Sequence, residues 1–168
     1  MNKLKKKLLS YAKGIPLNIF ITNFIFQKIL RIDSDCKFSK CFTSRVISPQ
    51  KIIIDGLKEN SSVLKSFAVS GGCYIQASEG LVIGEGTIWS FNVAIVSQGH
   101  NLKDFYKIPH NDPIEIGKNC WIGANSTILP GVKLGNNTIV GANSVVTSSF
   151  PEGGVIIGGV PAKLIRSI

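Results

Sequence analysis

IGKNCW-IGANST-ILPGVK-LGNNTI-VGANSV-VTSSFP, residues 116–151 written in blocks of six, is the stretch that decides the fold. An aliphatic residue opens each block, and these openers are Ile116, Ile122, Ile128, Leu134, Val140 and Val146. The fourth place of five blocks is Asn or Gly, namely Asn119, Asn125, Gly131, Asn137 and Asn143. Both residue types tolerate a positive φ, so the chain can turn a sharp corner every six residues.

Short strands separated by such corners cannot form a sheet alone, but stacked coils can. Each strand then pairs with the strand one coil away, at about 4.7–4.9 Å, and the aliphatic openers pile up inside. The period therefore predicts a solenoid of parallel strands. A weaker hexad phase opens at Val63, Val69 and Ile75, slips by two residues, and resumes at Ile83, Trp89 and Ile95.

These motifs resemble those of the hexapeptide-repeat acyltransferases, over roughly residues 69 to 168. The resemblance rests on NCWIGANSTILPGVKLGNNTIVGANSVVTSSFP (residues 119–151) and on the ending GGVPAKLIRSI (residues 158–168). It implies an all-β solenoid of left-handed hand, a parallel β-helix with three six-residue sides in each coil. Within the family, the chain looks closest to the O-acetyltransferases that modify sugars of capsule, exopolysaccharide or lipopolysaccharide.

The chain divides into a basic and apolar helical segment, residues 1–32, and a β-helix acyltransferase domain, residues 33–168. Residues 1–48 hold ten Lys or Arg and two acids, whereas the remaining 120 residues hold nine and eight. The repeats carry no basic stripe with interleaved aromatics, which argues against nucleic acid as a partner. The hexad phase breaks after Ile95, so residues 101–115 are expected to project as a loop, and residues 152–168 to close the domain.

The N-terminal segment begins with a basic stretch that contains Lys3, Lys5, Lys6, Lys7 and Lys13. An apolar run follows, but Asn18, Thr22, Asn23 and Gln27 interrupt it, so it is too short and too polar to span a membrane. We expect an amphipathic helix. It either lies on an anionic membrane through residues 1–31 or caps the end of the β-helix, and both can hold together.

His100, in the context SQGHNLKD, stands where the repeat stops and the loop begins. The resemblance implies that it is the general base, because the sugar O-acetyltransferases have a histidine just after this coil. Neutral imidazole accepts a proton near neutral pH. The expected reaction is direct transfer of acetyl from acetyl-coenzyme A to a sugar hydroxyl. His110, the other histidine, matches no pattern and is expected to be an ordinary loop residue.

Ala124 and Ala142 are 18 residues apart and should lie one above the other at a corner of the coils. In the family, the matching positions offer backbone hydrogen bonds to the pantetheine arm of coenzyme A. Small residues also simply suit a corner, so this pattern alone does not settle their role.

The resemblance implies further contacts with coenzyme A. Thr147 and Ser148 match the next contact along the arm, and Lys163 and Arg166 match the basic pair that meets the nucleotide phosphates. Trp121 is expected either to flank the arm or to pack between subunits.

Acceptor contacts are the least defined part of the site. Tyr74, Gln76 and Glu79 lie in the preceding coil, where they could reach the sugar or be ordinary surface residues. The family assembles as trimers, so we expect a homotrimer that shares its active site between chains.

Three other interpretations compete with a sugar O-acetyltransferase. An N-acetyltransferase of an amino-sugar nucleotide keeps the fold and the reaction class, and a non-catalytic scaffold keeps the fold alone. A zinc enzyme is disfavoured because only two histidines are present, without HxxxxH spacing, so no metal is expected. The four cysteines, Cys36, Cys41, Cys73 and Cys120, are expected to be free thiols in a cytoplasmic protein, which can associate with the inner face of the membrane.

Overall fold

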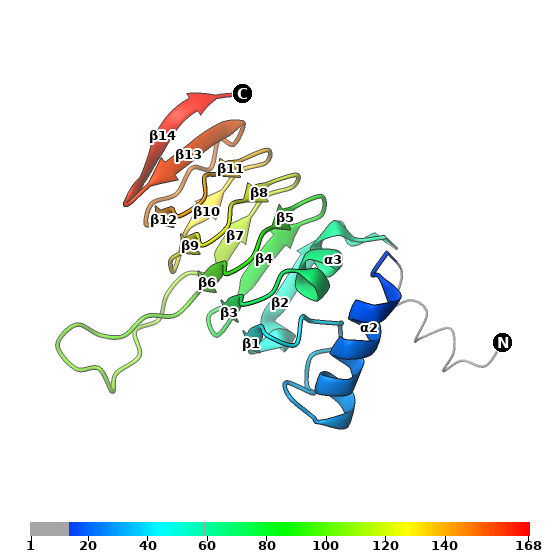
Figure 1. The fold of residues 1–168 in the computed structure, drawn as a ribbon. Helices are drawn as coiled ribbons and strands as arrows, with labels where there is room; N and C mark the ends of the chain where they lie inside the picture. Colours follow the sequence, from blue (N-terminus) through cyan, green and yellow to red (C-terminus); the bar gives the residue numbers. More distant parts are fainter. Residues whose placement is uncertain (1–13, 59) are drawn as a thin grey trace.

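The computed structural model describes residues 14–58 and 60–168, which form a left-handed parallel β-helix closed by different elements at its two ends (Figure 1). The lysines from Lys3 to Lys13 lie outside the described residues. The expected solenoid is confirmed.

Three stacks of short strands make the three sides of the prism. Sheet A contains β1 (Arg45–Ile47), β3 (Tyr74–Gln76), β6 (Ala94–Val96), β9 (Thr127–Ile128) and β12 (Val145–Val146). Sheet B contains β2 (Ile52–Asp55), β4 (Leu81–Gly84), β7 (Ile114–Ile116) and β10 (Lys133–Leu134). Sheet C contains β5 (Ile88–Trp89), β8 (Trp121–Ile122), β11 (Ile139–Val140), β13 (Val155–Gly159) and β14 (Ala162–Ser167).

The chain passes from sheet B to sheet C to sheet A in every coil, so the prism has an A–B, a B–C and a C–A corner. Asn119, Asn125, Asn137 and Asn143 have φ between 56° and 59°, and Gly131 has φ 73°, as the six-residue period predicts. Asn92, in the preceding coil, makes the same turn. Positive φ at a regular interval is therefore what bends the strands into coils.

The core is a column of the aliphatic openers. All six openers of residues 116–151 are at most 3% exposed, and the register stacks Ile95 on Ile128 and Ile122 on Val140. The fifth place of each block also points inward, and Cys120, Ser126, Thr138 and Ser144 are buried there. Each fully buried aliphatic side chain contributes about 1.5–3 kcal/mol, so the column holds the coils together.

The expected hexad phase at Val63 and Val69 is wrong, because these residues lie in a helix, α3 (Ser62–Val69). The Oγ of Ser61 accepts the backbone N–H of Leu64 at 3.2 Å and caps this helix. Val63, Ser66 and Phe67 form its buried face, with the three- and four-residue spacing of a helix. Helix α3 packs on β5 and takes the place of a sheet C strand in the first coil.

The N-terminal end of the prism is covered by α2 (Leu17–Phe24) and a π-helical turn, η1 (Ile25–Ile29) (Figure 1). A short 3₁₀ turn, η2 (Pro49–Lys51), joins the first two strands. No helix in the described ranges is long and apolar enough to cross a membrane.

Two features interrupt the regular stack. The chain leaves the body after β6 and returns at β7, and Figure 1 shows this segment projecting from one edge of the prism. Strand β7 begins at Ile114, so Ile114 and Glu115 of the expected loop 101–115 already belong to the sheet. At the C-terminal end, β13 and β14 form an antiparallel hairpin in an otherwise parallel fold.

Candidate active site

His100 lies in the projecting loop, four residues after the end of β6, with its side chain exposed. Its Nδ1 is 2.9 Å from the backbone carbonyl oxygen of Phe105. A carbonyl oxygen can only accept, so Nδ1 carries a proton, and in the neutral ring the lone pair then lies on Nε2. The loop backbone supports this arrangement, because Asn101 donates its N–H to Lys107 and its side-chain oxygen accepts the N–H of Lys103. The ring is thus held in the tautomer that a general base requires.

Glu79 connects the two stems of the loop. Its Oε1 accepts a hydrogen bond from Gln98 Nε2 at 2.9 Å, and its Oε2 is 2.8 Å from His110 Nδ1. Gln98 precedes His100 by two residues and His110 follows it by ten, so one carboxylate holds the loop on both sides of His100. Glu79 itself lies at the A–B corner between β3 and β4, on the rigid body of the prism.

The surroundings of Glu79 favour its charged form. Partial burial raises the pKa of this carboxyl, but the hydrogen bonds from His110 and Gln98 lower it more, and its pKa lies below the ordinary value. His110 is therefore more than an ordinary loop residue. A repeat pattern could not reveal this contact, because His110 and Glu79 are 31 residues apart and only the folded loop brings them together.

The three residues suggested for the acceptor have different surroundings. Tyr74 points outward from sheet A, where it lies in register between Arg45 and Ala94. Gln76 accepts the backbone N–H of Gln98 at 3.2 Å, so it and Glu79 both support the base of the loop. A role of these side chains in binding a sugar stays a prediction.

Ala124 and Ala142 lie one above the other at the C–A corner. The Asn125 side chain donates to the Asn143 side chain at 3.1 Å, and Asn143 N–H donates to the Ala124 carbonyl at 2.8 Å. Neither backbone group of Ala142 has a hydrogen-bond partner within the part of the chain that the structure describes. The corner therefore offers a free donor and acceptor at its upper level, beside small side chains.

Close packing at this corner requires glycine. A Cβ on Gly123 would lie 2.5 Å from the backbone nitrogen of Ala142, far inside van der Waals contact. The coils can stack here only because Gly123 has no side chain.

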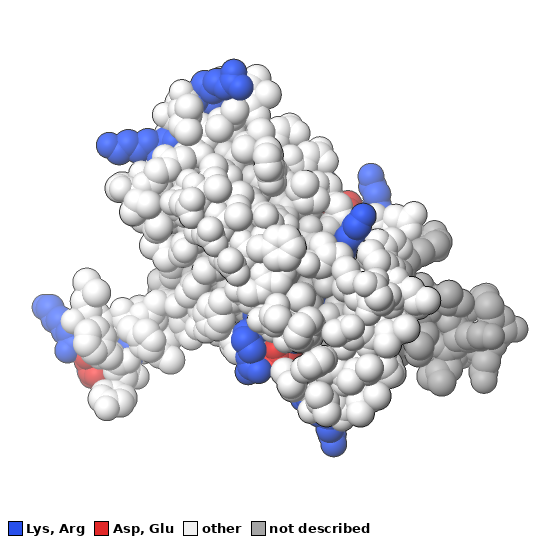
Figure 2. All heavy atoms as spheres, viewed as in Figure 1, with Lys and Arg blue, Asp and Glu red and all other residues white. Residues whose placement is uncertain are grey.

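The basic pair and the polar pair expected at the coenzyme lie elsewhere on the same half of the prism. Lys163 and Arg166 are exposed on β14, and Figure 2 shows basic side chains at the C-terminal end of the molecule. Thr147 and Ser148 are exposed after β12, at the A–B corner.

Trp121 is half exposed and belongs to a row on the outer face of sheet C. The register places Ile88, Trp121, Ile139 and Ile156 side by side across four strands, and all four are exposed or partly exposed. Within one chain, Trp121 is therefore not buried among other side chains. The four residues form an apolar row on a flat face of the prism.

Within one chain, the loop base and the alanine corner stand at opposite edges of sheet A. The five residues from Asn125 to Leu129 cross this sheet, and four steps of about 3.3 Å each span about 13 Å. The loop that carries His100 projects away from the body at one of these edges (Figure 1). Within one chain, the base of this loop is therefore not in contact with the corner that contains Ala124 and Ala142.

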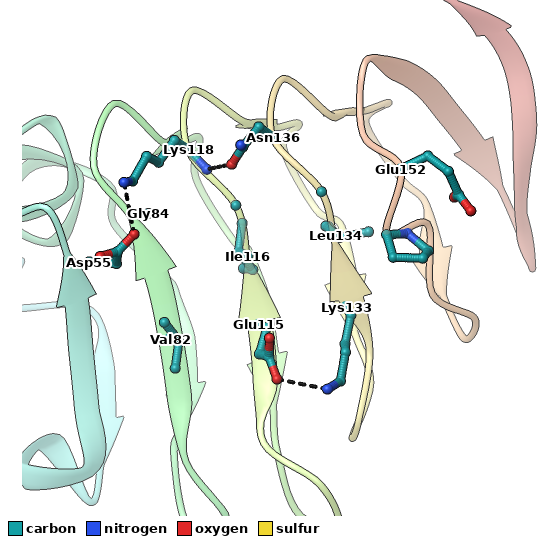
Figure 3. Close-up of a pocket in the computed structure, with 13 residues that line it drawn as sticks. Asp55, Val82, Gly84, Glu115, Ile116, Lys118, Lys133, Leu134, Asn136 and Glu152 are labelled. Atoms are coloured by element: carbon teal, nitrogen blue, oxygen red, sulfur yellow. Dashed lines mark hydrogen bonds and ion pairs between the residues drawn. The ribbon is translucent and has the colours of Figure 1, made fainter.

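A shallow groove of about 390 Å³ lies on sheet B, away from the residues discussed above. Two ion pairs occupy it: Lys118 Nζ lies 3.0 Å from Asp55 and Lys133 Nζ lies 2.8 Å from Glu115 (Figure 3). Hydrogen bonding and the charge of Glu115 raise the pKa of Lys133, which keeps its partner neutralised. The groove offers no unpaired basic group for phosphate, and none of the expected site residues lines it.

The described residues contain no group of three or more His, Cys, Asp or Glu side chains arranged to hold a metal ion. All four cysteines are free thiols, as expected. Burial raises the pKa of Cys120 and Cys73, and it raises the pKa of Cys36 to about 12. These thiols stay protonated at neutral pH and are poor nucleophiles.

Comparisons with known proteins agree with the repeat pattern. The model of a family described as bacterial transferase hexapeptide (six repeats) matches residues 113–148. WbbJ of Escherichia coli (strain K12), named as a candidate lipopolysaccharide biosynthesis O-acetyl transferase, is 31% identical over 159 residues. That alignment covers 84% of this chain and 76% of WbbJ.

Two further matches cover less sequence or show the fold alone. Protein CapG of Staphylococcus aureus is 51% identical over 84 residues, which are 50% of this chain and 42% of CapG, so the chain spans less than half of that relative. A galactoside acetyltransferase solved in complex with coenzyme A is 21% identical, with a TM-score of 0.52 over 98% of this chain and 78% of that one. From the six-residue period, the three-sided parallel fold and the near full-length match to WbbJ, the chain belongs to the hexapeptide-repeat acetyltransferase family.

Proposed function

We propose that the protein is an acetyl-coenzyme A-dependent O-acetyltransferase that modifies a sugar hydroxyl of a surface polysaccharide or its precursor. The observation that carries the proposal is the hydrogen bond from His100 Nδ1 to the Phe105 carbonyl, because it leaves Nε2 as the free base. Support for a sugar acceptor comes from the similarity to WbbJ, whose name refers to lipopolysaccharide biosynthesis. Support for coenzyme A comes from the family and from the galactoside acetyltransferase complex.

The proposed chemistry is direct transfer. Nε2 of His100 takes the proton of the sugar hydroxyl as its oxygen bonds to the thioester carbonyl carbon. The tetrahedral intermediate then collapses, the carbon–sulfur bond breaks, and the imidazolium returns its proton to the leaving thiolate. The products are an acetyl ester and coenzyme A. Cys36, Cys73 and Cys120 are disfavoured as nucleophiles because they are buried and protonated.

In this proposal, the free backbone groups of Ala142 and the small residues of the C–A corner receive the pantetheine arm. Lys163 and Arg166 meet the phosphates, and Thr147 and Ser148 make further contacts. Replacing Ala142 with Leu would fill the corner. The affinity of the Ala142→Leu variant for coenzyme A, measured by calorimetry, should therefore fall at least tenfold.

The proposed assembly is a homotrimer that brings the His100 loop of one chain to the alanine corner of the next. Two observations support it: the two edges of sheet A are about 13 Å apart in one chain, and sheet C carries the apolar row with Trp121. Closed cyclic symmetry would bury such a flat face in each chain. A Trp121→Glu variant should then sediment as a smaller species and lose activity.

The decisive experiment compares His100→Asn with His110→Asn. General-base catalysis contributes about 10²–10⁴-fold, so transfer to a panel of sugars and lipid-linked glycans should fall by that factor in His100→Asn. Affinity for coenzyme A should stay within twofold, and His110→Asn should lose less than tenfold. If His100→Asn still transferred acetyl at the wild-type rate, His100 would not be the general base. Mass spectrometry before and after mild base separates an ester from the amide of an N-acetyltransferase.

A further inference from the structure

In α2 and η1, the face that packs on the protein is polar and the face that points outward is apolar. Asn23 and Gln27 are 1% and 3% exposed, and each side chain makes three hydrogen bonds with the segment that follows or with α3. The large apolar side chains point the other way. Those that remain exposed are Leu17, Ile21, Phe24, Ile25, Ile29 and Leu30, here called the cap stripe.

The cap stripe is a continuous surface on one side of the helix. Its members recur at spacings of four, three and one, which place them along one face of a helical cylinder. Leu17 is 71% exposed and Ile29 is 62% exposed, at opposite ends of the stripe. In Figure 2 the surface over α2 is free of Lys, Arg, Asp and Glu side chains on the visible face. A helix that buries amide side chains and exposes six large apolar side chains has the pattern of a surface that binds a partner or a membrane.

Basic residues precede this helix in the sequence and are exposed at its C-terminal end. The sequence just before the helix contains Lys3, Lys5, Lys6, Lys7 and Lys13 and no acidic residue. At the other end of the helix, Lys28, Arg31 and Lys37 are exposed, against one exposed acid, Asp35. Asp33 does not add to the exposed acids, because it pairs with Lys40 and Arg45.

We propose that the cap stripe docks on the surface of an anionic lipid bilayer, with the N-terminal end of the prism toward the membrane. A helix that exposes a row of apolar side chains, in a segment of sequence rich in Lys and Arg, has the composition of an interfacial helix. Each lysine near an anionic surface strengthens binding by about fivefold. A second copy of the chain fits the cap stripe less well, because two such surfaces would bring their basic flanks together.

The orientation has a consequence for the proposed acceptor. Helix α2 lies at one end of the prism and β14, which carries Lys163 and Arg166, at the other, so coenzyme A would enter from the side away from the lipid (Figure 1). If the chains associate side by side through sheet C, as proposed above, three caps face the same way and bind the bilayer together. This orientation favours a lipid-linked glycan as the acceptor, an inference that rests on the proposed function.

The test is sedimentation of the full-length protein with large unilamellar vesicles, without acetyl-coenzyme A or sugar. Vesicles contain either phosphatidylglycerol with phosphatidylethanolamine or phosphatidylcholine alone. We expect binding to the anionic vesicles only, weakened in 0.5 M salt. Ile21→Gln with Ile29→Gln should lose at least tenfold, and Ile53→Gln with Leu57→Gln, which changes equally exposed apolar residues elsewhere, should lose less than twofold.

Circular dichroism confirms that each variant is folded, and sedimentation velocity gives its oligomeric state. Failure of the wild-type protein to bind anionic vesicles, or equal binding by both double variants, would overturn the proposal. So would a change of oligomeric state in Ile21→Gln with Ile29→Gln, since the stripe would then be an interface between copies. Vesicle binding needs no catalysis, so this result is independent of the outcome for His100.

Discussion

Asn23 gives the sharpest stability prediction, because its side chain joins α2 to the first coil. Its Nδ2 donates to the Ala68 carbonyl at 2.9 Å and to Ser39 Oγ at 3.2 Å, and its Oδ1 accepts the N–H of Phe42 at 3.1 Å. The substitution Asn23→Ala removes all three bonds and leaves the buried Ala68 carbonyl, the buried Ser39 hydroxyl and the partly buried Phe42 N–H without these partners.

The cost follows from these three orphaned groups. A buried unsatisfied polar group costs about 1–3 kcal/mol, and the Phe42 N–H belongs at the low end because it is only partly buried. Alanine regains about 0.5 kcal/mol of helix propensity. The free energy of unfolding should therefore fall by about 2–3 kcal/mol. Asn18→Ala is the matched control, since Asn18 is exposed in the same helix and gains the same propensity without losing a buried partner.

The assay is urea unfolding at one fixed protein concentration, because association with other copies adds to apparent stability. Hydrogen exchange is measured in parallel on residues 17–30, since this cap can open without the coils unfolding. The reasoning would be refuted if Asn23→Ala lost less than 0.5 kcal/mol and kept the wild-type protection of α2. The amide would then not be what holds the helix on the prism.

Three further predictions concern ionisable side chains. Glu79→Gln should lower kcat about tenfold, because the loop that carries His100 is held less firmly, and its affinity for coenzyme A by calorimetry should stay within twofold. An unchanged kcat would show that the contacts of Glu79 with Gln98 and His110 are not needed for catalysis. Burial raises the pKa of Glu85, but hydrogen bonds from Ser61 and Ser62 at the start of α3 lower it more, so the stability it contributes is present above about pH 4.5 and is lost as pH falls through its lowered pKa. The thermal midpoint of Glu85→Gln should accordingly change less than that of the wild type between pH 5 and pH 3, and equal slopes would contradict this. With a thiol reagent at pH 7.5, Cys41 alone should react within minutes, and Cys41→Ser should abolish that fast phase.

The regular part of the fold was accessible from the sequence because one physical rule repeats in it. Every sixth residue is aliphatic and the fourth residue of five of the six blocks has a positive φ, so Asn125 and Asn143 define both a corner and the stacking of coils. The same rule fails at Val63 and Val69. Two aliphatic residues six apart are also compatible with a helix, and the capping Ser61 was the signal that distinguished them.

The candidate site was accessible only in part. The position of His100 follows from the end of the repeat, and the stacking of Ala124 and Ala142 follows from the coil length. The contact of Glu79 with Gln98 and His110 does not follow from either, because it depends on the path of an irregular loop. The inward direction of Asn23 and Gln27 was likewise hidden, since polar residues in an apolar run normally indicate the solvent face.

The C-terminal hairpin has a consequence for self-association. A stack of parallel coils ends in unpaired backbone groups, and another stack could add to them and grow into a filament. Here β14 turns back antiparallel on β13, so sheet C ends in a strand whose direction no incoming coil of the same kind matches. At the opposite end, α2 covers the stack and α3 replaces a strand. Both ends of sheet C thus differ from the repeats between them, which disfavours the addition of a further parallel coil along this sheet.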